Sequence, residues 1–183
     1  MAEPSPALRQ TVRIVDGFSD WSGKLGAWLI LPLTLGLTYE SVARYLFDAP
    51  TLWAFDLSYM MYAAIFMLGA HYTLMKGAHI RTDMLWEKFT PRTKGAIDAV
   101  AYVFFFFPAM ILFFYASVDE AWASWKMGEL SEQTAWRPIL WPFKAIVPLT
   151  ALLLMVQGVS ELLKSLYAAR TGRFLTTAET IQI

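Results

Sequence analysis

Three ionisable side chains in the first third of the chain have the types and spacing for proton or ion chemistry. Glu40 and Arg44 are four residues apart, so they share one face of any helix that contains them, and Asp56 follows after a short connection. An acid without a partner in an apolar stretch is suited to carry a proton, whereas a neighbouring guanidinium turns it into half of a structural ion pair. We predict the structural alternative, in which Arg44 bridges Glu40 and Asp56 and clamps two helices together.

The two histidines, His71 and His79, are poorly arranged for ligand chemistry. A haem or metal site needs ligands that face one another, and the sequence has no further histidine to complete a pair on another helix. We expect His71 to pack or hydrogen-bond between helices. We expect His79 to join a local capping or ion-pair cluster with Arg81 and Asp83.

Polar residues also interrupt the last apolar stretch. Gln157 lies inside it beside Gly158, and an amide in lipid seeks a partner on another helix, which glycine allows to come close. The alternatives for Gln157 are a packing contact and a transport site, and we favour the packing contact. Lys144 and Glu161 lie near the two ends of this stretch, where Lys144 can extend its ammonium group toward water.

Catalytic motifs are missing from the sequence. It contains no cysteine, which removes disulfides, thiolate catalysis, iron–sulfur ligation and cysteine-based zinc sites. It contains no HExxH pair, no phosphate-binding glycine loop and no recognisable nucleophile–base pair. The net charge of zero gives no indication of a nucleic-acid partner. We therefore predict a protein that is not an enzyme and has no cofactor or metal of its own.

Long, nearly charge-free stretches must position these residues. Charged residues make up 16% of the chain, against about 25% in a typical soluble domain. A bilayer core needs about 20 apolar residues in one helix, because each residue rises about 1.5 Å. We predict helices over residues 25–47, 54–75, 97–118 and 142–166. The expected fold is an all-α integral membrane protein, with one domain of four transmembrane helices over residues 25–166.

The flanking segments are expected to be cytoplasmic. Residues 1–24 are either a disordered tail or include an interfacial helix, and residues 167–183 form a second tail. Apolar residues at helical spacing predict a short amphipathic helix over residues 80–89, on the membrane surface. Pro108 and Pro148 predict bends in the third and fourth spans, because proline removes a backbone donor and crowds the preceding turn.

The distribution of Lys and Arg predicts the orientation. Cytoplasmic flanks of membrane helices carry an excess of these residues. Eleven of the 15 fall in the two terminal flanks and the second connection, and four fall on the other side. Both termini are therefore expected in the cytoplasm, with the first and third connections outside. The eleven are Arg9, Arg13, Lys24, Lys76, Arg81, Lys88, Arg92, Lys94, Lys164, Arg170 and Arg173.

Several of these residues fall in a familiar arrangement. They are Arg44-Tyr45-Leu46-Phe47, Trp53, Asp56, Gly69, His79-Ile80-Arg81-Thr82-Asp83, Pro142, Lys144, Pro148, Gln157-Gly158 and Glu161. Over residues 21–166 the chain resembles the small membrane subunit (DctQ-type) of tripartite ATP-independent periplasmic (TRAP) transporters. The HIRxD element at residues 79–83 is the most specific part. Asp56 stands where the family more often has glutamate.

The resemblance implies a place in a three-part importer of the bacterial inner membrane. Such transporters combine a periplasmic substrate-binding protein, a large membrane subunit that moves as an elevator, and a small subunit of this type. They import organic acids, often carboxylates, with a sodium gradient, and the substrate and sodium sites lie in the large subunit. The resemblance thus implies a scaffold, in which the polar residues named above have structural or partner-contact roles.

Two other functions remain as alternatives. A stand-alone proton-coupled exporter, built as a dimer of four-helix subunits, would transport in liposomes without other subunits. A haem- or quinone-binding anchor of a respiratory enzyme would, in the haem case, show a visible absorption spectrum.

Overall fold

The structure is a computed structural model that describes residues 4–77 and 89–175. The described residues are almost entirely helical, which confirms the all-α fold for this part of the chain. The only pairing of extended backbone there is an isolated bridge between Leu130 and Ile139, in the loop before the last helix. The elements are α1 (Pro6–Trp28), α2 (Ile30–Phe47), α3 (Ala54–Met75), α5 (Pro91–Ala101), the π-helix η1 (Tyr102–Phe106), α6 (Phe107–Met127) and α7 (Trp141–Thr171).

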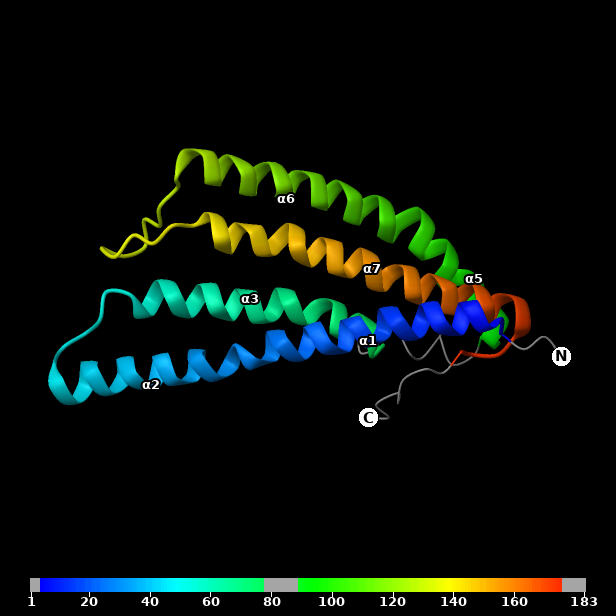
Figure 1. Cartoon of the computed structure of the whole chain (residues 1–183), viewed down its shortest axis with the longest axis horizontal. Helices are drawn as coiled ribbons and strands as arrows, with labels where there is room; N and C mark the ends of the chain where they lie inside the picture. Colours follow the sequence, from blue (N-terminus) through cyan, green and yellow to red (C-terminus); the bar gives the residue numbers. More distant parts are fainter. Residues whose placement is uncertain (1–3, 78–88, 176–183) are drawn as a thin grey trace.

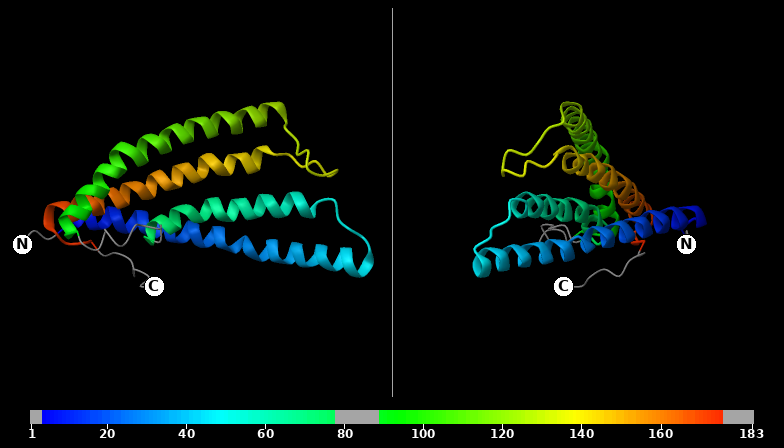
Figure 2. Two further views of the ribbon diagram at one scale, coloured as in Figure 1. Left: turned by 180° about the vertical axis from the view of Figure 1, so that it is seen from behind. Right: turned by 60° about the vertical axis from the view of Figure 1, so that its left-hand side comes forward.

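The long helices lie side by side in one layer (Figure 1). Helix α6 packs on α7, α7 packs on α3, and α3 packs on α2. At one end α1 crosses onto α3 and α7, and α5 packs on α7, so the layer is thickest there. Figure 2 shows the same layer from behind and from one side. The start of α1 and the end of α7 lie at this thick end, and the α2–α3 and α6–α7 loops lie at the other.

The first helix begins much earlier than the sequence indicated. Residues 1–24, expected to be a tail or an interfacial segment, are helical from Pro6 onward, with Ser5 as the N-cap. Helix α1 then continues almost directly into α2, with a break at Leu29 only. Pro32 accounts for the break, because it has no amide hydrogen to donate to the carbonyl group of Trp28, and its ring crowds that carbonyl.

The third helix is also longer than expected, running from Pro91 to Met127 instead of over residues 97–118. The segment made of α5, η1 and α6 is curved (Figure 2), and Pro108, which was predicted to bend it, lies at the start of α6. The turns just before Pro108 form the π-helix η1, and the amide of Phe107 donates to the carbonyl of Tyr102, five residues back. The wider π-turn relieves the clash of the proline ring with the preceding carbonyl.

The remaining helices match the prediction more closely. Helix α3 occupies the same residues as the predicted second helix, and α7 is a few residues longer than the predicted 142–166, with Pro148 inside it. The interfacial helix predicted at residues 80–89 lies almost wholly outside the described residues.

Among the described residues, three helices are long and apolar enough to cross a membrane: Pro6–Phe47, Pro91–Met127 and Trp141–Thr171. Helix α3, which carries Asp56 and His71, is not among them. The prediction of four spans with both termini in the cytoplasm therefore stays a prediction.

The interior is made of small and polar residues, with most large apolar side chains on the outside. The buried apolar residues are mainly alanines, and the buried polar ones include Asp16, Asp56, His71 and Gln157. Leu35 on α2, by contrast, is 70% exposed. This inverted distribution is typical of a protein in lipid, where small residues let helices approach and internal hydrogen bonds hold them together.

Candidate functional site

A buried polar cluster joins α1 to α7. We call Asp16, Ser19, Gln157, Ser160, Glu161 and Lys164 the α1–α7 cluster. The Ser19 hydroxyl donates to Gln157 Oε1 at 2.7 Å, and Gln157 Nε2 donates to Asp16 Oδ1 at 3.1 Å. Ser160 Oγ donates to the same Asp16 oxygen at 2.7 Å. Gln157, the amide that the sequence singled out, thus has partners on α1, in the segment expected to be a tail or to include an interfacial helix.

The charges of this cluster are paired internally. Lys164 Nζ lies 2.8 Å from Asp16 Oδ2 and 2.8 Å from Glu161 Oε1. Gln157 Nε2 also donates to Glu161 Oε1 at 3.0 Å. Each acid therefore meets a cation or an amide, which is how ionisable groups are tolerated between helices in an apolar surrounding. This arrangement holds α1 against α7.

Glycines bring α1 against α3 in the turns of α1 that follow Ser19. A Cβ atom on Gly23 would lie 2.6 Å from Cβ of Tyr72, and one on Gly26 would lie 3.2 Å from Cβ of Leu68. Next to this contact, Ser22 Oγ and His71 Nε2 lie 2.8 Å apart. His71 is fully buried, as expected for a residue packed between helices.

At the opposite end, Glu40 ties α2 to the turn that follows it. Arg44 Nε and Nη2 donate to Glu40 Oε1 at 2.9 and 2.5 Å. The backbone amide of Thr51 donates to Glu40 Oε2 at 3.0 Å, and the Thr51 hydroxyl donates to the same oxygen. The predicted pairing of Glu40 with Arg44 is therefore present.

The predicted bridge from Arg44 to Asp56 is wrong. Asp56 is fully buried at the start of α3 and accepts hydrogen bonds from the loop between α6 and α7 instead. Ser131 Oγ donates to Asp56 Oδ1 at 2.6 Å, and the Thr134 hydroxyl donates to Oδ2. Both carboxylate oxygens are thereby engaged, so Asp56 fixes this loop onto the start of α3 and does not join α2 to α3.

Lys144 forms two ion pairs at the same end of the molecule. Its ammonium group lies 2.6 Å from Glu120 Oε1 on α6 and 2.6 Å from Glu129 Oε2 in the loop. The hydrogen bond from Lys144 holds the pKa of the Glu129 carboxyl below its usual value. Lys144 was expected to reach outward to water, and here it links the first turn of α7 to α6 and the loop.

The arrangement as a whole suits helix assembly. Within residues 4–77 and 89–175, no group of three or more His, Cys, Asp and Glu side chains is placed to hold a metal ion. His79, Arg81 and Asp83 lie outside the described residues, so their predicted cluster stays a prediction. The polar groups at both ends connect helices and loops of this chain to one another.

Comparison with known families decides the identity. The sequence matches the family model described as "Tripartite ATP-independent periplasmic transporters, DctQ component" over residues 33–167. The chain belongs to the DctQ family. No curated protein and no solved structure matches it. The predicted resemblance is thereby confirmed, and the chain is a component of a TRAP transporter, which is a transporter family and not an enzyme family.

The DctQ match begins after α1, and this marks what the sequence reasoning missed. Asp16 and Ser19 are both outside the matched residues, and we did not single them out. A signal was present: the buried positions of α1 recur at alternating steps of four and three residues. They are Val12, Asp16, Ser19, Gly23 and Gly26. This is a helix-packing face, but its members are mostly small or polar, so hydropathy does not reveal it.

Proposed function

We propose that this DctQ-family chain is the scaffold subunit of a TRAP transporter that imports organic acids of the carboxylate class across the bacterial inner membrane. In this proposal it anchors the static part of a large elevator-type membrane subunit that binds substrate and sodium. A periplasmic binding protein delivers the substrate. The chain itself takes no part in the chemistry of transport.

The uncovered apolar edges of the helix layer carry this proposal. In the described part of the chain, helices α2 and α6 form the two edges, and each packs mainly on one long neighbour, α3 for α2 and α7 for α6. On α2, Leu35 is 70% exposed and Tyr45 is 82% exposed, and on α6 Leu112 is 71% exposed. Surfaces of this kind suit lipid or a partner's helices. A subunit that widens a membrane complex needs such edges.

The α3 helix is the fourth span in this proposal. It has 22 residues and is therefore about 33 Å long, enough for a bilayer core of about 30 Å. Its buried polar residues Asp56 and His71 face partners within the protein, which is the condition under which polar side chains are tolerated in a span. Four spans put the two termini on one side, and the Lys and Arg excess favours the cytoplasm.

The α1–α2 helix is longer than the other proposed spans. At 42 residues it is about 63 Å long, twice the thickness of the hydrocarbon core, so it cannot lie in the bilayer along its full length. The break at Leu29 divides it into the more apolar α2, which spans, and α1, which crosses the ends of α3 and α7. Arg81, Asp83 and His79 are proposed to orient the segment that follows α3.

Cross-linking in the native membrane tests the scaffold role. A photo-reactive residue at Leu35 or Leu112 is expected to capture the large membrane subunit from at least one of the two edges. The same residue at Leu153, which is 8% exposed on α7, serves as control and is expected to react within the chain. If neither edge captures another membrane protein and the isolated chain transports a solute in liposomes, the scaffold role is wrong and the exporter alternative holds.

A further inference from the structure

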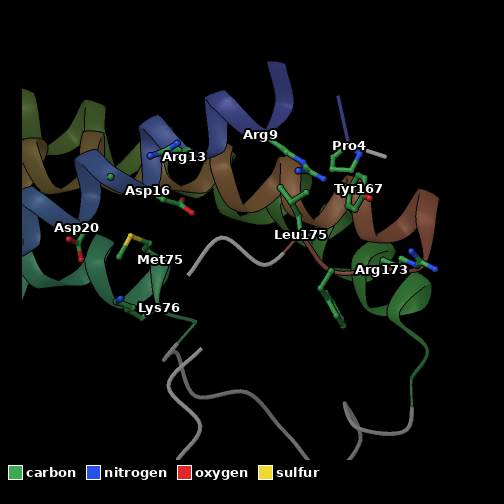
Figure 3. Close-up of a pocket in the computed structure, with 12 residues that line it drawn as sticks. Pro4, Arg9, Arg13, Asp16, Asp20, Met75, Lys76, Tyr167, Arg173 and Leu175 are labelled. Carbon is green, nitrogen blue, oxygen red and sulfur yellow. The ribbon is translucent and has the colours of Figure 1, made fainter. Parts of the chain in front are cut away.

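A cavity of about 820 Å³ lies at the thick end of the molecule, between α1 and the C-terminal ends of α3 and α7 (Figure 3). It is of the size of a typical small-molecule site. Its cationic lining comes from all three elements: Arg9 and Arg13 on α1, Lys76 after α3 and Arg173 after α7. None of the site residues described above except Asp16 belongs to it.

The positive charge of the cavity is not balanced by its own carboxylates. Asp16 pairs with Lys164 at 2.8 Å, and Asp20 pairs with Lys24 at 2.5 Å. Within the described chain, Arg9 and Arg13 make no hydrogen bond or ion pair, and Lys76 makes only a contact over the ring of Tyr72 at 5.5 Å. Arg9, Arg13 and Lys76 thus bring positive charge to one space whose two carboxylates, Asp16 and Asp20, already pair with lysines outside its lining. Such an excess of positive charge creates a local field that favours an anion.

The rest of the lining is apolar. Met75, Phe174, Leu175 and Pro4 line the cavity together with Tyr167. The cavity also lies where two apolar helices end, since Lys76 follows α3 directly and Arg173 follows α7. In a membrane this is the level at which hydrocarbon gives way to headgroups, and basic pockets between helices at this level suit anionic headgroups. Cations and apolar groups in one cavity match an amphiphile with an anionic head.

We propose that this cavity binds the phosphate group of an anionic phospholipid, with Arg9, Arg13 and Lys76 as the phosphate ligands. Guanidinium groups form charge-assisted hydrogen bonds with phosphate oxygens, and the lysine adds a point charge. The apolar wall contacts the glycerol and the first part of the acyl chains. Because the binding residues come from α1 and from the end of α3, the bound lipid also fastens α1 to the rest of the protein.

Gly17 offers a way to close the cavity without touching its charges. It lines the cavity, and a Cβ atom added there meets no other atom within 4 Å. The variant Gly17→Leu therefore places its side chain in the open space and leaves the packing of α1 intact. The matched control for the cations is Arg170→Gln, because Arg170 is exposed near the end of α7 and does not line the cavity.

The test uses the full chain, purified with any subunits that accompany it, in detergent micelles containing phosphatidylglycerol or phosphatidylcholine. Native mass spectrometry counts the retained lipids. The wild type and Arg170→Gln are expected to retain one phosphatidylglycerol per chain and little phosphatidylcholine. The triple variant Arg9→Gln, Arg13→Gln, Lys76→Gln and, separately, Gly17→Leu are expected to lower retention at least tenfold. Circular dichroism checks that the variants keep their helical content.

Three outcomes overturn the proposal. Equal retention of phosphatidylcholine removes the role of the anionic head, and unchanged retention by both the triple variant and Gly17→Leu places the lipid elsewhere. Displacement of phosphatidylglycerol by millimolar inorganic phosphate assigns the cavity to a soluble phosphate compound and overturns the lipid part.

Discussion

Ser19 on α1 donates a 2.7 Å hydrogen bond to Gln157 on α7, across 138 residues of sequence. Both side chains are almost fully buried. The contact lies between a helix outside the residues matched by the DctQ family and the helix that closes the matched region. The side-chain amide of Gln157 thus connects α1 to the residues that match the DctQ family.

Replacing Gln157 with Leu should loosen α1. The change removes hydrogen bonds to Ser19, Asp16 and Glu161 and leaves their polar atoms in a dry interface. Hydrogen bonds between membrane helices contribute about 0.6 kcal/mol each on average, so we expect a loss of about 1–2 kcal/mol. Thermal unfolding in detergent measures it. Gln133→Leu, at an exposed loop position, should leave the midpoint unchanged, and equal midpoints for the two variants would contradict the role of Gln157.

Replacing Gly95 with Ala should separate α5 from α7. The added Cβ would lie 2.5 Å from the backbone nitrogen of Ala169 and 2.5 Å from the carbonyl oxygen of Ser165, and backbone atoms cannot move aside as side chains can. Overpacking of this kind costs about 1–3 kcal/mol. We expect a lower unfolding temperature and a lower yield of folded protein.

The matched control is Gly69→Ala, inside α3. A Cβ atom at Gly69 meets nothing within 4 Å, and alanine stabilises a helix interior by about 0.5–1 kcal/mol relative to glycine. The two substitutions are chemically identical and should act in opposite directions. A stabilised Gly95→Ala variant would show that α5 and α7 are farther apart than described.

The helices that sequence reasoning located well are those whose apolar runs are complete in themselves. The predicted second helix ends at Met75 because the apolar run stops at Lys76 and Gly77. In the third helix, Pro108 indicates the bend because proline has no amide hydrogen and crowds the preceding turn. A helix within residues 1–24 was one of two alternatives, but its packing against α3 and α7 was not predicted. The buried face of α1 includes Asp16, Ser19 and glycines, and these residues indicate packing only once α3 and α7 are in place.

Among the polar residues, sequence reasoning located the contact between near neighbours and missed the contacts between distant segments. The pairing of Glu40 with Arg44 follows from their spacing on one helix, so sequence was sufficient for it. The partners of Asp56 are Ser131 and Thr134, more than seventy residues later, in a loop whose path no local pattern specifies. A carboxylate near a guanidinium in sequence is a reasonable but insufficient ground for an ion pair, because two hydroxyls from a distant loop can satisfy it equally well.

Replacing Asp56 with Ala should release the α6–α7 loop. The loop keeps its internal bonds, such as Ser131 N to Pro138 O at 2.8 Å, but it loses the carboxylate that accepts its two hydroxyl groups. We expect cleavage by a glutamate-specific protease at Glu132 to speed up several-fold. Asp119→Ala, at an exposed position near the end of α6, is the control and should be cleaved at the wild-type rate.

The complementary variants Ser131→Ala and Thr134→Val remove the hydroxyl donors and leave Asp56 in place. They should expose the loop to the same protease, singly to a smaller extent than together. A loop that stays protected in all three cases would mean that its position depends on the Lys144 contacts alone.

Glu40 and Arg44 should differ in their effect on assembly. Glu40 is 8% exposed and joins α2 to Thr51, whereas the Arg44 side chain is 54% exposed and has Glu40 as its one partner among the described residues. Glu40→Ala should therefore lower the thermal stability of the chain more than Arg44→Ala. Arg44→Ala should mainly reduce recovery of the complex with the large subunit from detergent. Full assembly with selective loss of substrate binding would contradict a structural role for Arg44.

The contact between Lys144 and Glu129 should make the thermal stability of the chain depend on pH. The hydrogen bond from Lys144 lowers the pKa of Glu129 in the folded state, so Glu129 loses its proton at a lower pH in the folded chain than in the unfolded chain. The resulting stabilisation is fully present above the ordinary glutamate pKa, about 4.3, and is lost as the pH falls through the lowered value. Lys144→Gln should unfold at a lower temperature than the wild type at pH 7, and the difference should shrink as the pH approaches 3.

Lys126→Gln, which removes a cation that lies over the Trp122 ring, should show no such convergence. A constant gap between Lys144→Gln and wild type from pH 7 to pH 3 would mean that the lysine acts through packing and not through its charge.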